Sequence, residues 1–448
     1  MSDVSPQTIF GWSPLILSCT VMVASYALIV SERLNRAIVA LLGAGLMIIT
    51  GVIDQDQAFR GIDFNTIGLL IGMMVLVAVM KDCGVFQYVA IKAVKAAGGR
   101  PWGILVMLAT ITAILSALLD NVTTVLLVAP VTLLIADELQ INPYPLLFAE
   151  INASNSGGTA TLIGDPPNIM IGSAAGLTFN DFVLNLAPLV VVVFLATLVP
   201  LWFIYGRHLT IAEGAASRLL AFNENEAITD WRLLRQSLTV FGGVITAFVL
   251  ARPFHLEPAT IALCGAGVLL LLVTVGQAPD HATRRLHAVF SEVEWVTIFF
   301  FCGLFVIVAG VEHAGLLTLL AEETLRLTGG DLALTSMAVL WVSALASAVV
   351  DNIPFVATMI PLLNDLMPGF QSAATDQGRA ESLWWALAAG ACLGGNGTLI
   401  GASANLVVAG IAERNGVPFR FLPFLKVAFP IMLLQVAIGG VYLWLRYL

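Results

Sequence analysis

The chain has 448 residues, of which 59% are apolar and only 11% are charged, and its mean hydropathy is +0.94. Soluble domains carry about 25% charged residues, so this chain has too little polar surface for a soluble enzyme. Its high apolar content also excludes a disordered protein. The net charge of -9, with no dense cluster of Lys and Arg, argues against nucleic acid as a partner. The composition predicts an all-α polytopic membrane protein.

Ten apolar runs are long enough to cross about 30 Å of hydrocarbon and predict ten transmembrane helices. They lie near residues 11–30, 36–53, 66–81, 145–176, 182–205, 236–251, 257–275, 295–311, 382–410 and 422–446. Two further apolar stretches, 102–136 and 334–366, are each interrupted midway by an Asp-Asn pair. We expect each of these to form a re-entrant hairpin of two half-length helices.

The distribution of positive charge predicts the orientation in the membrane. When the loops are assigned alternately to the two faces, 15 of the 20 Lys and Arg residues fall on one face. Cytoplasmic loops carry this kind of excess. We therefore expect an integral protein of the cell inner membrane with its N- and C-termini outside, in the periplasm.

An internal repeat divides the chain into two halves. The stretch Ser116–Asn121 matches Ser347–Asn352, 231 positions later, and Gly157–Asn168 matches Gly394–Asn405 at an offset of 237. Each half holds five predicted spans, an odd number, so the second half is inverted in the membrane relative to the first. The predicted organisation is a first inverted repeat (1–205), a cytoplasmic linker (206–235) and a second inverted repeat (236–448).

Four predicted breaks in the helices mark the candidate site. Two are the hairpin tips at Asp120-Asn121 and Asp351-Asn352, and two are the glycine-rich stretches 157–168 and 394–405. Non-helical backbone at membrane depth is tolerated only inside protein or beside a cavity, where half-helix ends hold polar solutes. The corresponding positions in the two halves predict one site between the two tips and the two unwound helices.

The carboxylates in these segments each have a structural interpretation beside the functional one. An Asp-Asn pair can simply cap a helix or form a turn. Its recurrence inside apolar stretches favours a function, because an intramembrane carboxylate costs roughly 2.5–3.5 kcal/mol. Asp165, whose counterpart is Ala402, handles an ion or proton in one half only, or belongs to a turn. Glu150, whose counterpart is Leu387, carries a proton or lies near the cytoplasmic end.

Other chemistry finds no support in the sequence. No Gly-Lys-Ser/Thr follows Gly157-Gly158, so the chain by itself is not an ATP-driven pump. The five cysteines are scattered without metal-ligand spacing, so we expect neither a metal centre nor a cofactor. An intramembrane enzyme or an ion channel fits the paired, inverted breaks less well than alternating access does.

These motifs resemble a known group. Ser116–Pro130 and Gly157–Gly172, with Ser347–Pro361 and Gly394–Gly410, are similar to the ion transporter superfamily, in its arsenite permease and melanosomal P-protein branch. The resemblance implies secondary transport by hairpins and unwound helices that move against a scaffold, often in a homodimer. A separate cytoplasmic ATPase subunit could dock on the short loops. The residues that it assigns to substrate or proton binding are Asp120, Asn121, Thr123, Asp165, Asn168, Asp351, Asn352, Asn396, Thr398 and Asn405.

The residue types at the two hairpin tips indicate which class of solute the site can bind. Carboxylate carriers of the superfamily have Ser-Asn-Thr at both tips, whereas this chain has Asp-Asn at both and no basic residue at the four breaks. Such a site repels a dianion and suits a cation, a proton or a neutral hydrogen-bonding solute such as arsenous acid. We expect proton-coupled efflux of arsenite, with antimonite as a second substrate, and sodium/proton antiport is the alternative. Only Cys392 abuts a break, so we expect oxygen atoms rather than several thiolates to bind the solute.

Overall fold

The structure, a computed structural model, describes residues 8, 11–31, 33–211, 223–371 and 377–448. Within these ranges every regular element is helical, as the composition predicts. The predicted linker 206–235 contains residues 212–222, which lie outside the described residues.

The described helices follow the predicted order of apolar runs. In the first half they are α1 (Pro14–Val30), α2 (Arg36–Ile49), α3 (Gln55–Gly61), α4 (Phe64–Lys81), α5 (Val85–Ala96), α6 (Pro101–Leu118), α7 (Asn121–Leu139), α8 (Tyr144–Thr159), α9 (Pro166–Ala175) and α10 (Phe179–Ile204). The short 3-10 helices η2 (Gly206–His208) and η3 (Glu224–Ala227) follow.

The second half repeats this pattern. Its helices are α12 (Trp231–Val249), α13 (Ala251–Phe254), α14 (Pro258–Thr274), α15 (Pro279–Ser291), α16 (Trp295–His313), α17 (Leu316–Thr328), α18 (Leu332–Ser347), α19 (Asn352–Gln371), α20 (Gln377–Ala380), α21 (Ser382–Gly394), η4 (Gly395–Gly397), α22 (Ser403–Arg414) and α23 (Phe421–Tyr447). Among the described residues, seven helices are long and apolar enough to cross a membrane, namely α4, α6, α7, α10, α16, α19 and α23.

Two predicted crossings are broken in the middle, at corresponding places. Helix α8 ends at Thr159 and α9 begins at Pro166, whereas α21 ends at Gly394 and α22 begins at Ser403. In the first break the two consecutive prolines at the start of α9 have no backbone N–H to continue a helical hydrogen-bond ladder. In the second, the glycines lower the propensity for helix. The predicted unwound segments are therefore present in both halves.

The two hairpins form, but their arms are not half-length as we expected. The arms α6 and α7 have 18 and 19 residues, and α18 and α19 have 16 and 20. A helix of 18 residues is roughly 27 Å long at the usual rise, which is close to a full membrane thickness. The reason is that apolar residues continue on both sides of each Asp-Asn pair for as long as in an ordinary span.

Close helix crossings on glycine occur in symmetric pairs. A Cβ atom on Gly72 of α4 would lie 2.7 Å from the backbone of Ala262 in α14. A Cβ atom on Gly303 of α16 would lie 2.5 Å from the backbone of Ala40 in α2. Small residues let helix backbones approach closely within a membrane. The pairs α4/α14 and α2/α16 thus form two equivalent contacts between the two halves.

Each hairpin packs on the broken helix of its own half through another glycine. Gly157 of α8 faces Ala113 of α6, and a Cβ atom there would lie 2.2 Å from the carbonyl oxygen of Ala113. Gly394 of α21 faces Ala344 of α18 in the same way, at 2.4 Å. These contacts place the unwound segments directly beside the hairpin tips.

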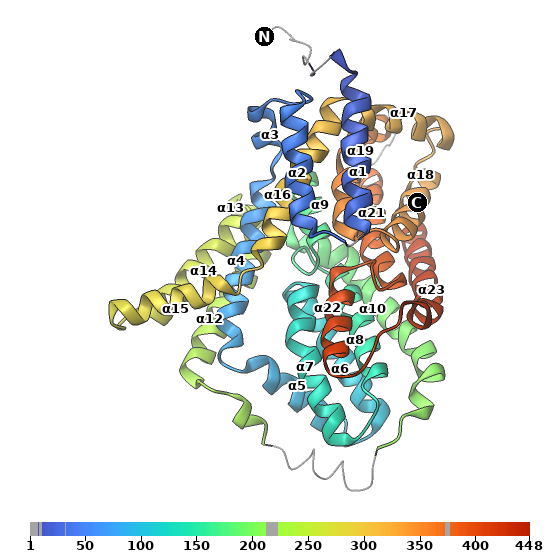
Figure 1. The fold of residues 1–448 in the computed structure, drawn as a ribbon. Helices are drawn as coiled ribbons and strands as arrows, with labels where there is room; N and C mark the ends of the chain where they lie inside the picture. Colours follow the sequence, from blue (N-terminus) through green and yellow to red (C-terminus); the bar gives the residue numbers. More distant parts are fainter. Residues whose placement is uncertain (1–7, 9–10, 32, 212–222, 372–376) are drawn as a thin grey trace.

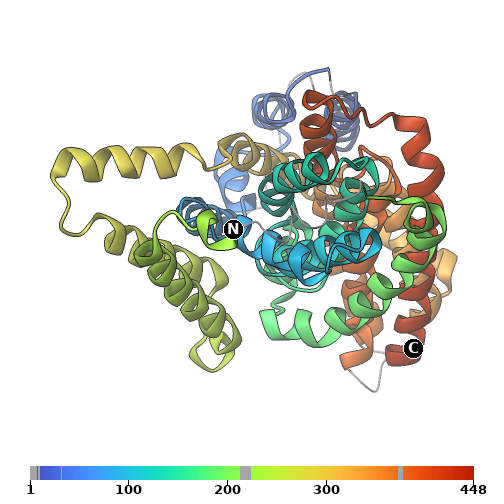
Figure 2. The ribbon, with the colours of Figure 1, turned by 90° about the horizontal axis from the view of Figure 1, so that it is seen from below.

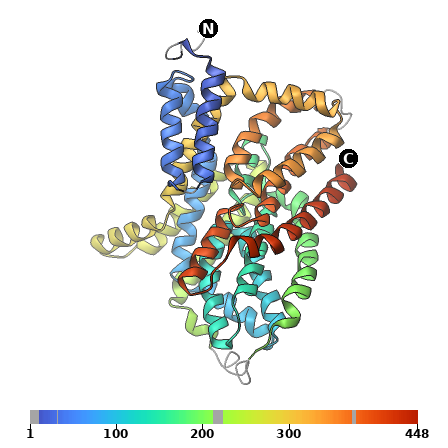
Figure 3. The ribbon, with the colours of Figure 1, turned by 45° about the vertical axis from the view of Figure 1, so that its right-hand side comes forward.

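The arrangement in space agrees with two halves that point in opposite directions. The hairpin α6/α7 lies in the lower half of the molecule in Figure 1, and the hairpin α18/α19 lies in the upper half. Figure 3 shows α1 and α2 standing beside each other at the end that carries the N-terminus. Helix α15 projects away from the body, which is clearest from below (Figure 2).

Large apolar side chains cover parts of the outer surface. Helix α10 exposes Leu184 (64%), Val191 (58%) and Leu195 (58%) while it buries Leu186 and Leu189. An apolar face of this size on a soluble protein would be unstable in water. It is the surface that a lipid bilayer requires.

Candidate functional site

The first hairpin tip is held by its own acidic residue. Asp120 is the N-cap of α7 and accepts a hydrogen bond of 2.8 Å from the backbone N–H of Thr123, whose hydroxyl also donates to the carboxylate. The side chain of the next residue, Asn121, donates to Asn155 of α8 at 3.3 Å. The capping interpretation of Asp120 is therefore correct, and Thr123 contributes to the cap.

The second tip has a different partner. Asp351 forms an ion pair of 3.2 Å with Arg36, which comes from the start of α2, and accepts a hydrogen bond of 2.6 Å from Ser403 of α22. The same guanidinium donates to the hydroxyl of Thr297 at 3.2 Å and lies over the ring of Phe300 in α16. The expectation of two acidic tips without a cation is wrong at this tip, because the chain brings an arginine from a distant segment.

Two asparagines hold the unwound backbones in shape. The amide nitrogen of Asn168 donates to the carbonyl of Thr161 at 2.9 Å, and that of Asn405 donates to the carbonyl of Thr398 at 2.8 Å. Unwound segments leave carbonyl groups without helical partners, and a buried unpaired carbonyl is costly. These two amides satisfy such groups and leave their own oxygen atoms for other contacts.

Hydroxyl groups fasten each unwound segment to its own hairpin. Thr161 donates to the carbonyl of Ala117 at 2.5 Å, and Thr398 donates to the carbonyl of Ala348 at 2.5 Å. The hydroxyl of Ser116 donates to the carbonyl of Ser154, and Ser347 repeats this contact in the second half. We call these four bonds the hairpin staples. The hydroxyl of Thr398, a predicted binding residue, is thus engaged with the backbone.

A cluster of amides joins the two halves. The side-chain nitrogen of Asn155 donates to the oxygen of Asn396 at 3.0 Å and to the oxygen of Asn405 at 2.9 Å. Asn396 in turn donates to Gln435 of α23 at 2.9 Å. We call Asn121, Asn155, Asn396 and Asn405 the amide cluster. All four are 3% exposed or less.

Asp165, at the first unwound segment, contacts the second hairpin tip. It occupies the N-cap position of α9 but makes no capping hydrogen bond with its side chain. Both carboxylate oxygens instead lie 3.3 Å from the amide nitrogen of Asn352, at the second tip. The thiol of Cys392 donates to the side-chain oxygen of Asn168, three residues after Asp165, at 3.5 Å. A carboxylate that does not cap its helix is available for another task.

Further acids lie close to Asp165 in the fold. Asp120 and Asp351 occupy the two hairpin tips, and Asn352, next to Asp351, contacts Asp165. Within the described part of the chain, no Lys, Arg or His forms an ion pair with Asp165. Since Arg36 is engaged with Asp351, the site centred on Asp165 favours a cation, a proton or a neutral solute over an anion.

The predicted residues fall into three groups. Asn121, Asn396 and Asn405 meet in the amide cluster, and Asp165 and Asn352 meet beside Asn168. Asp120, Thr123, Thr398 and Asp351 form local caps, staples or an ion pair. All ten are buried or partly buried where the four breaks come together. Their part in binding a solute stays a prediction.

Sequence reasoning missed three residues of the centre. Arg36 lies in no break, so its approach to Asp351 needs the folded structure. Asn155 and Gln435 lie inside predicted spans and were not separated from ordinary span residues. A signal existed for Asn155, because it belongs to the polar run Asn152–Ser156 inside an apolar segment. Gln435 is a single amide inside the apolar last span.

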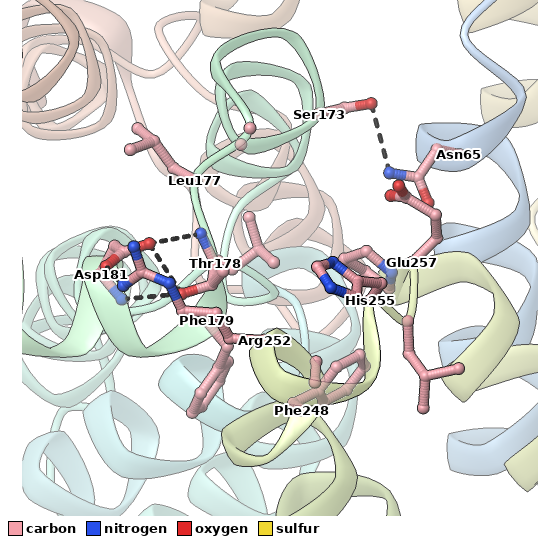
Figure 4. A pocket seen from close by; sticks show the side chains of 16 residues that line it. Asn65, Ser173, Leu177, Thr178, Phe179, Asp181, Phe248, Arg252, His255 and Glu257 are labelled. Atoms are coloured by element: carbon pink, nitrogen blue, oxygen red, sulfur yellow. Dashed lines mark hydrogen bonds and ion pairs between the residues drawn. The ribbon is translucent and has the colours of Figure 1, made fainter.

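A cavity of about 390 Å³ lies beside α9, away from the amide cluster. It is lined by the start of α4, the turn between α9 and α10, and the segment before α14 (Figure 4). Asn65 donates to Ser173 at 3.2 Å on one side, and Arg252 lies 3.8 Å from Asp181 on the other. The cavity contains none of the ten predicted site residues.

An all-helical chain with duplicated hairpins, broken helices and a buried polar centre has the architecture of a membrane transporter. The sequence agrees with this class. Residues 26–390 match the model of the citrate transporter family CitMHS, and the chain belongs to that family. Because this is a transporter family, the protein is a transporter and not an enzyme.

The relatives extend from bacteria to mammals. An uncharacterized transporter of Mycobacterium tuberculosis is 44% identical over 436 residues, which cover 96% of this chain and 98% of the relative. The P protein of Homo sapiens is 35% identical over 508 residues, which cover 95% of this chain and 59% of that protein. The likeness to the P protein supports the branch of the superfamily that the motifs indicate.

A solved structure supports the fold. The YdaH transporter of Alcanivorax borkumensis has a TM-score of 0.56 with this structure at 14% sequence identity, and the match covers 97% of this chain and 99% of that one. At this identity the likeness concerns the fold alone.

Proposed function

We propose that the protein is a proton-coupled efflux carrier for arsenite, with antimonite as a second substrate. The observation that carries the proposal is the group around Asp165. The amide of Asn352 contacts the carboxylate, the thiol of Cys392 contacts Asn168 three residues further on, and no basic side chain among the described residues forms an ion pair with the carboxylate. Arsenous acid is uncharged near pH 7 and presents three hydroxyl groups. Amides and a carboxylate can bind those hydroxyls, and trivalent arsenic has affinity for a thiol.

An organic anion fits this centre less well. A citrate ion would approach Asp165 and Asp120, neither of which forms an ion pair among the described residues. Like charges at close range in a medium of low dielectric repel strongly. Arg36 could offset part of this repulsion only by leaving Asp351. The acidic centre therefore favours a neutral solute over the tricarboxylate that gives the family its name.

Proton coupling follows from the same carboxylates. A buried carboxylate without a cation is expensive at membrane depth, so exchange of a proton for a bound solute is the low-cost way to empty and refill the site. An inward proton gradient then drives the solute out of the cell. We assign both termini to the periplasm on the 15-to-5 distribution of Lys and Arg, which sets the direction of this exchange.

Sodium/proton antiport is the second candidate. Asp165, Asn352 and Asn168 offer carboxylate and amide oxygens, which are the ligands that hard cations prefer. The thiol of Cys392 separates the two proposals, because sulfur is a poor ligand for sodium and a good one for trivalent arsenic.

Everted membrane vesicles energised by respiration test the proposal. We expect arsenite to accumulate in vesicles that contain the wild-type protein, and to be lost when a protonophore collapses the proton gradient. The variant Asp165→Asn is the negative control. A loss of the proton gradient on addition of sodium or lithium, without arsenite accumulation, would reject arsenite efflux and establish the antiporter.

A further inference from the structure

One buried acid remains outside the site described above. Glu150 lies within α8, where each residue from Pro145 to Thr159 is buried, and its own exposure is 0%. One carboxyl oxygen accepts a hydrogen bond from the hydroxyl of Thr132 in α7. The other oxygen has no hydrogen-bond partner among the described residues. A carboxyl group at this depth carries a high cost as an anion and a low one as a neutral acid.

Among the described residues, no charged side chain forms an ion pair with Glu150. Helix α8 contacts α6, α7, α10, α21, α22 and η4. Its Phe148 also packs on Tyr205 and on Phe424 of α23, where the nearby Lys426 is exposed. The helix α6 contributes no titratable side chain, and α21 contributes only the thiol of Cys392. The acidic and basic residues of α7, α10 and α22 lie in their first or last turns, namely Asp137, Glu138, Asp181, Glu413 and Arg414. Burial and the hydroxyl of Thr132 therefore define the electrostatic environment of Glu150.

Polar groups occur at both ends of the contact between α7 and α8, at Glu150 and at the amide cluster. Thr132 faces Glu150, and Asn121 faces Asn155 near the other end of the same contact. Between them, the hydroxyl oxygen of Thr124 is buried and has no hydrogen-bond partner among the described residues. The side-chain oxygen of Asn121 is also buried and has none among these residues. Buried polar atoms without partners are uncommon in folded proteins. Thr124 and Asn121 lie near the amide cluster, and roughly 12 Å of α7 separates Thr124 from Thr132, so a proton that passes between the two ends needs water in this contact.

The position along α8 fits a role between solvent and site. Glu150 lies six residues after the start of α8 and five residues before Asn155, or roughly 9 Å and 7.5 Å along the axis. The start of α8 is the end that the charge distribution assigns to the cytoplasm. The counterpart of Glu150 in the second half is Leu387, inside the apolar helix α21. Helix α21 therefore has no acid at the place equivalent to Glu150.

We propose that Glu150 is the proton carrier on the cytoplasmic side of the amide cluster. The carboxyl group holds one proton while the site is empty, and releases it through the 140–143 end of α7/α8 when a solute enters on that side. One O–H bond breaks at each release, and the same bond re-forms when a proton arrives through the site from outside. This inference rests on the proposed function, since it names the group that couples the proton to that transport.

Purified protein in proteoliposomes separates transport from coupling. Exchange of radiolabelled arsenite between equal internal and external pools needs no net proton movement, whereas net uptake driven by a pH gradient needs it. In Glu150→Gln we expect gradient-driven uptake to fall at least about tenfold, while exchange stays within about twofold of wild type. Glu150→Asp should restore gradient-driven uptake with an altered pH profile. Asp137→Asn, an exposed acid at the same end of α7, is the matched control and should match wild type in both assays.

Three results would overturn the inference. The first is wild-type gradient-driven uptake in Glu150→Gln. The second is an equal loss of exchange and of driven uptake in a folded, monodisperse Glu150→Gln protein, which would indicate a structural role. The third applies if Glu150→Gln does not fold. An unchanged pH profile of gradient-driven uptake in Glu150→Asp would then overturn the inference. Wild-type protein that exchanges sodium but not arsenite rejects only the substrate, and both assays then run with labelled sodium.

Discussion

The two hairpin tips have the same backbone and different chemistry. Each tip begins a helix with an Asp-Asn pair, and each is tied to its own unwound segment by the same staples. Asp120 caps α7 and forms no ion pair among the described residues, whereas Asp351 is paired with Arg36. The duplicated interactions are those that hold the backbone. The interactions that set the charge occur in one half only.

The two broken helices differ in the same manner. Asn155 of the first half corresponds to Cys392 of the second, and each donates to the asparagine oxygen of the opposite half. Asp165 corresponds to Ala402, which offers no polar side chain. The fold is thus symmetric while the site is not, so substitutions at equivalent positions distinguish structural from functional residues.

Asp165→Asn should have the largest effect on transport. The substitution removes the charge that the amide of Asn352 contacts, and a hydrogen bond to a charged group contributes about 1.5–3 kcal/mol. We expect arsenite accumulation in everted vesicles to fall about 100-fold, which corresponds to about 2.7 kcal/mol. Ala402→Ser, at the equivalent backbone position, should leave accumulation close to wild type. Equal losses in both variants would contradict the functional asymmetry.

Gly72→Ala and Gly303→Ala should lower stability by similar amounts. A methyl group at either position overlaps the backbone of the facing helix, and overpacking of this kind costs about 1–3 kcal/mol. The measurement is the thermal unfolding midpoint of the purified protein in detergent. Gly242→Ala, where a Cβ atom meets nothing within 4 Å, is the control. A shift in only one of the two variants would show that the paired crossings are not equivalent.

Arg36→Gln should reduce transport about tenfold, because it leaves Asp351 without its cation. The two side chains are 28% and 14% exposed, so the effect is reduced by solvent from the several kcal/mol of a fully buried pair to about 1.4 kcal/mol. Adding Asp351→Asn should recover part of the loss, since the unpaired charge is then gone. Arg33→Gln, at an exposed neighbour, controls for loss of positive charge. Strictly additive losses in the double variant would show that the two residues act independently.

Cys392→Ser should have the smallest effect and should depend on the solute. The thiol contributes one contact of a soft ligand, so we expect the apparent affinity for arsenite to fall about threefold. Transport of sodium, if present, should not change. Cys264→Ser, an exposed cysteine, provides the matched control. An unaltered arsenite affinity in Cys392→Ser would remove the thiol from the site and favour oxygen ligands alone.

The sequence predicts the fold well because its signals are local. An Asp-Asn pair inside an apolar stretch, or glycines followed by two prolines, marks a break without knowledge of the neighbours. The repeat then shows which breaks correspond. The lengths of the hairpin arms were wrong because apolar length alone does not say where a membrane begins.

The site was only partly predictable, since its charges depend on contacts between distant segments. Arg36 approaches Asp351 across 315 positions of sequence, and Asn155 reaches Asn405 across 250. Neither contact can be predicted from the sequence pattern of the two segments that form it. The position of Asp165 could be predicted from its motif. That its side chain makes no capping hydrogen bond could be learned only from the geometry of α9.

The hairpin staples also bear on the order in which the chain folds during synthesis. They join residues 38 to 50 positions apart, whereas the bonds from Asn155 to Asn396 and Asn405 span 241 and 250 positions. Contacts between near segments close at a lower entropic cost and form sooner. The first hairpin can therefore be joined to α8 and to its unwound segment as soon as residue 161 has left the ribosome. The amide cluster must wait for more than 200 further residues, so the centre of the protein forms after the first hairpin is already in place.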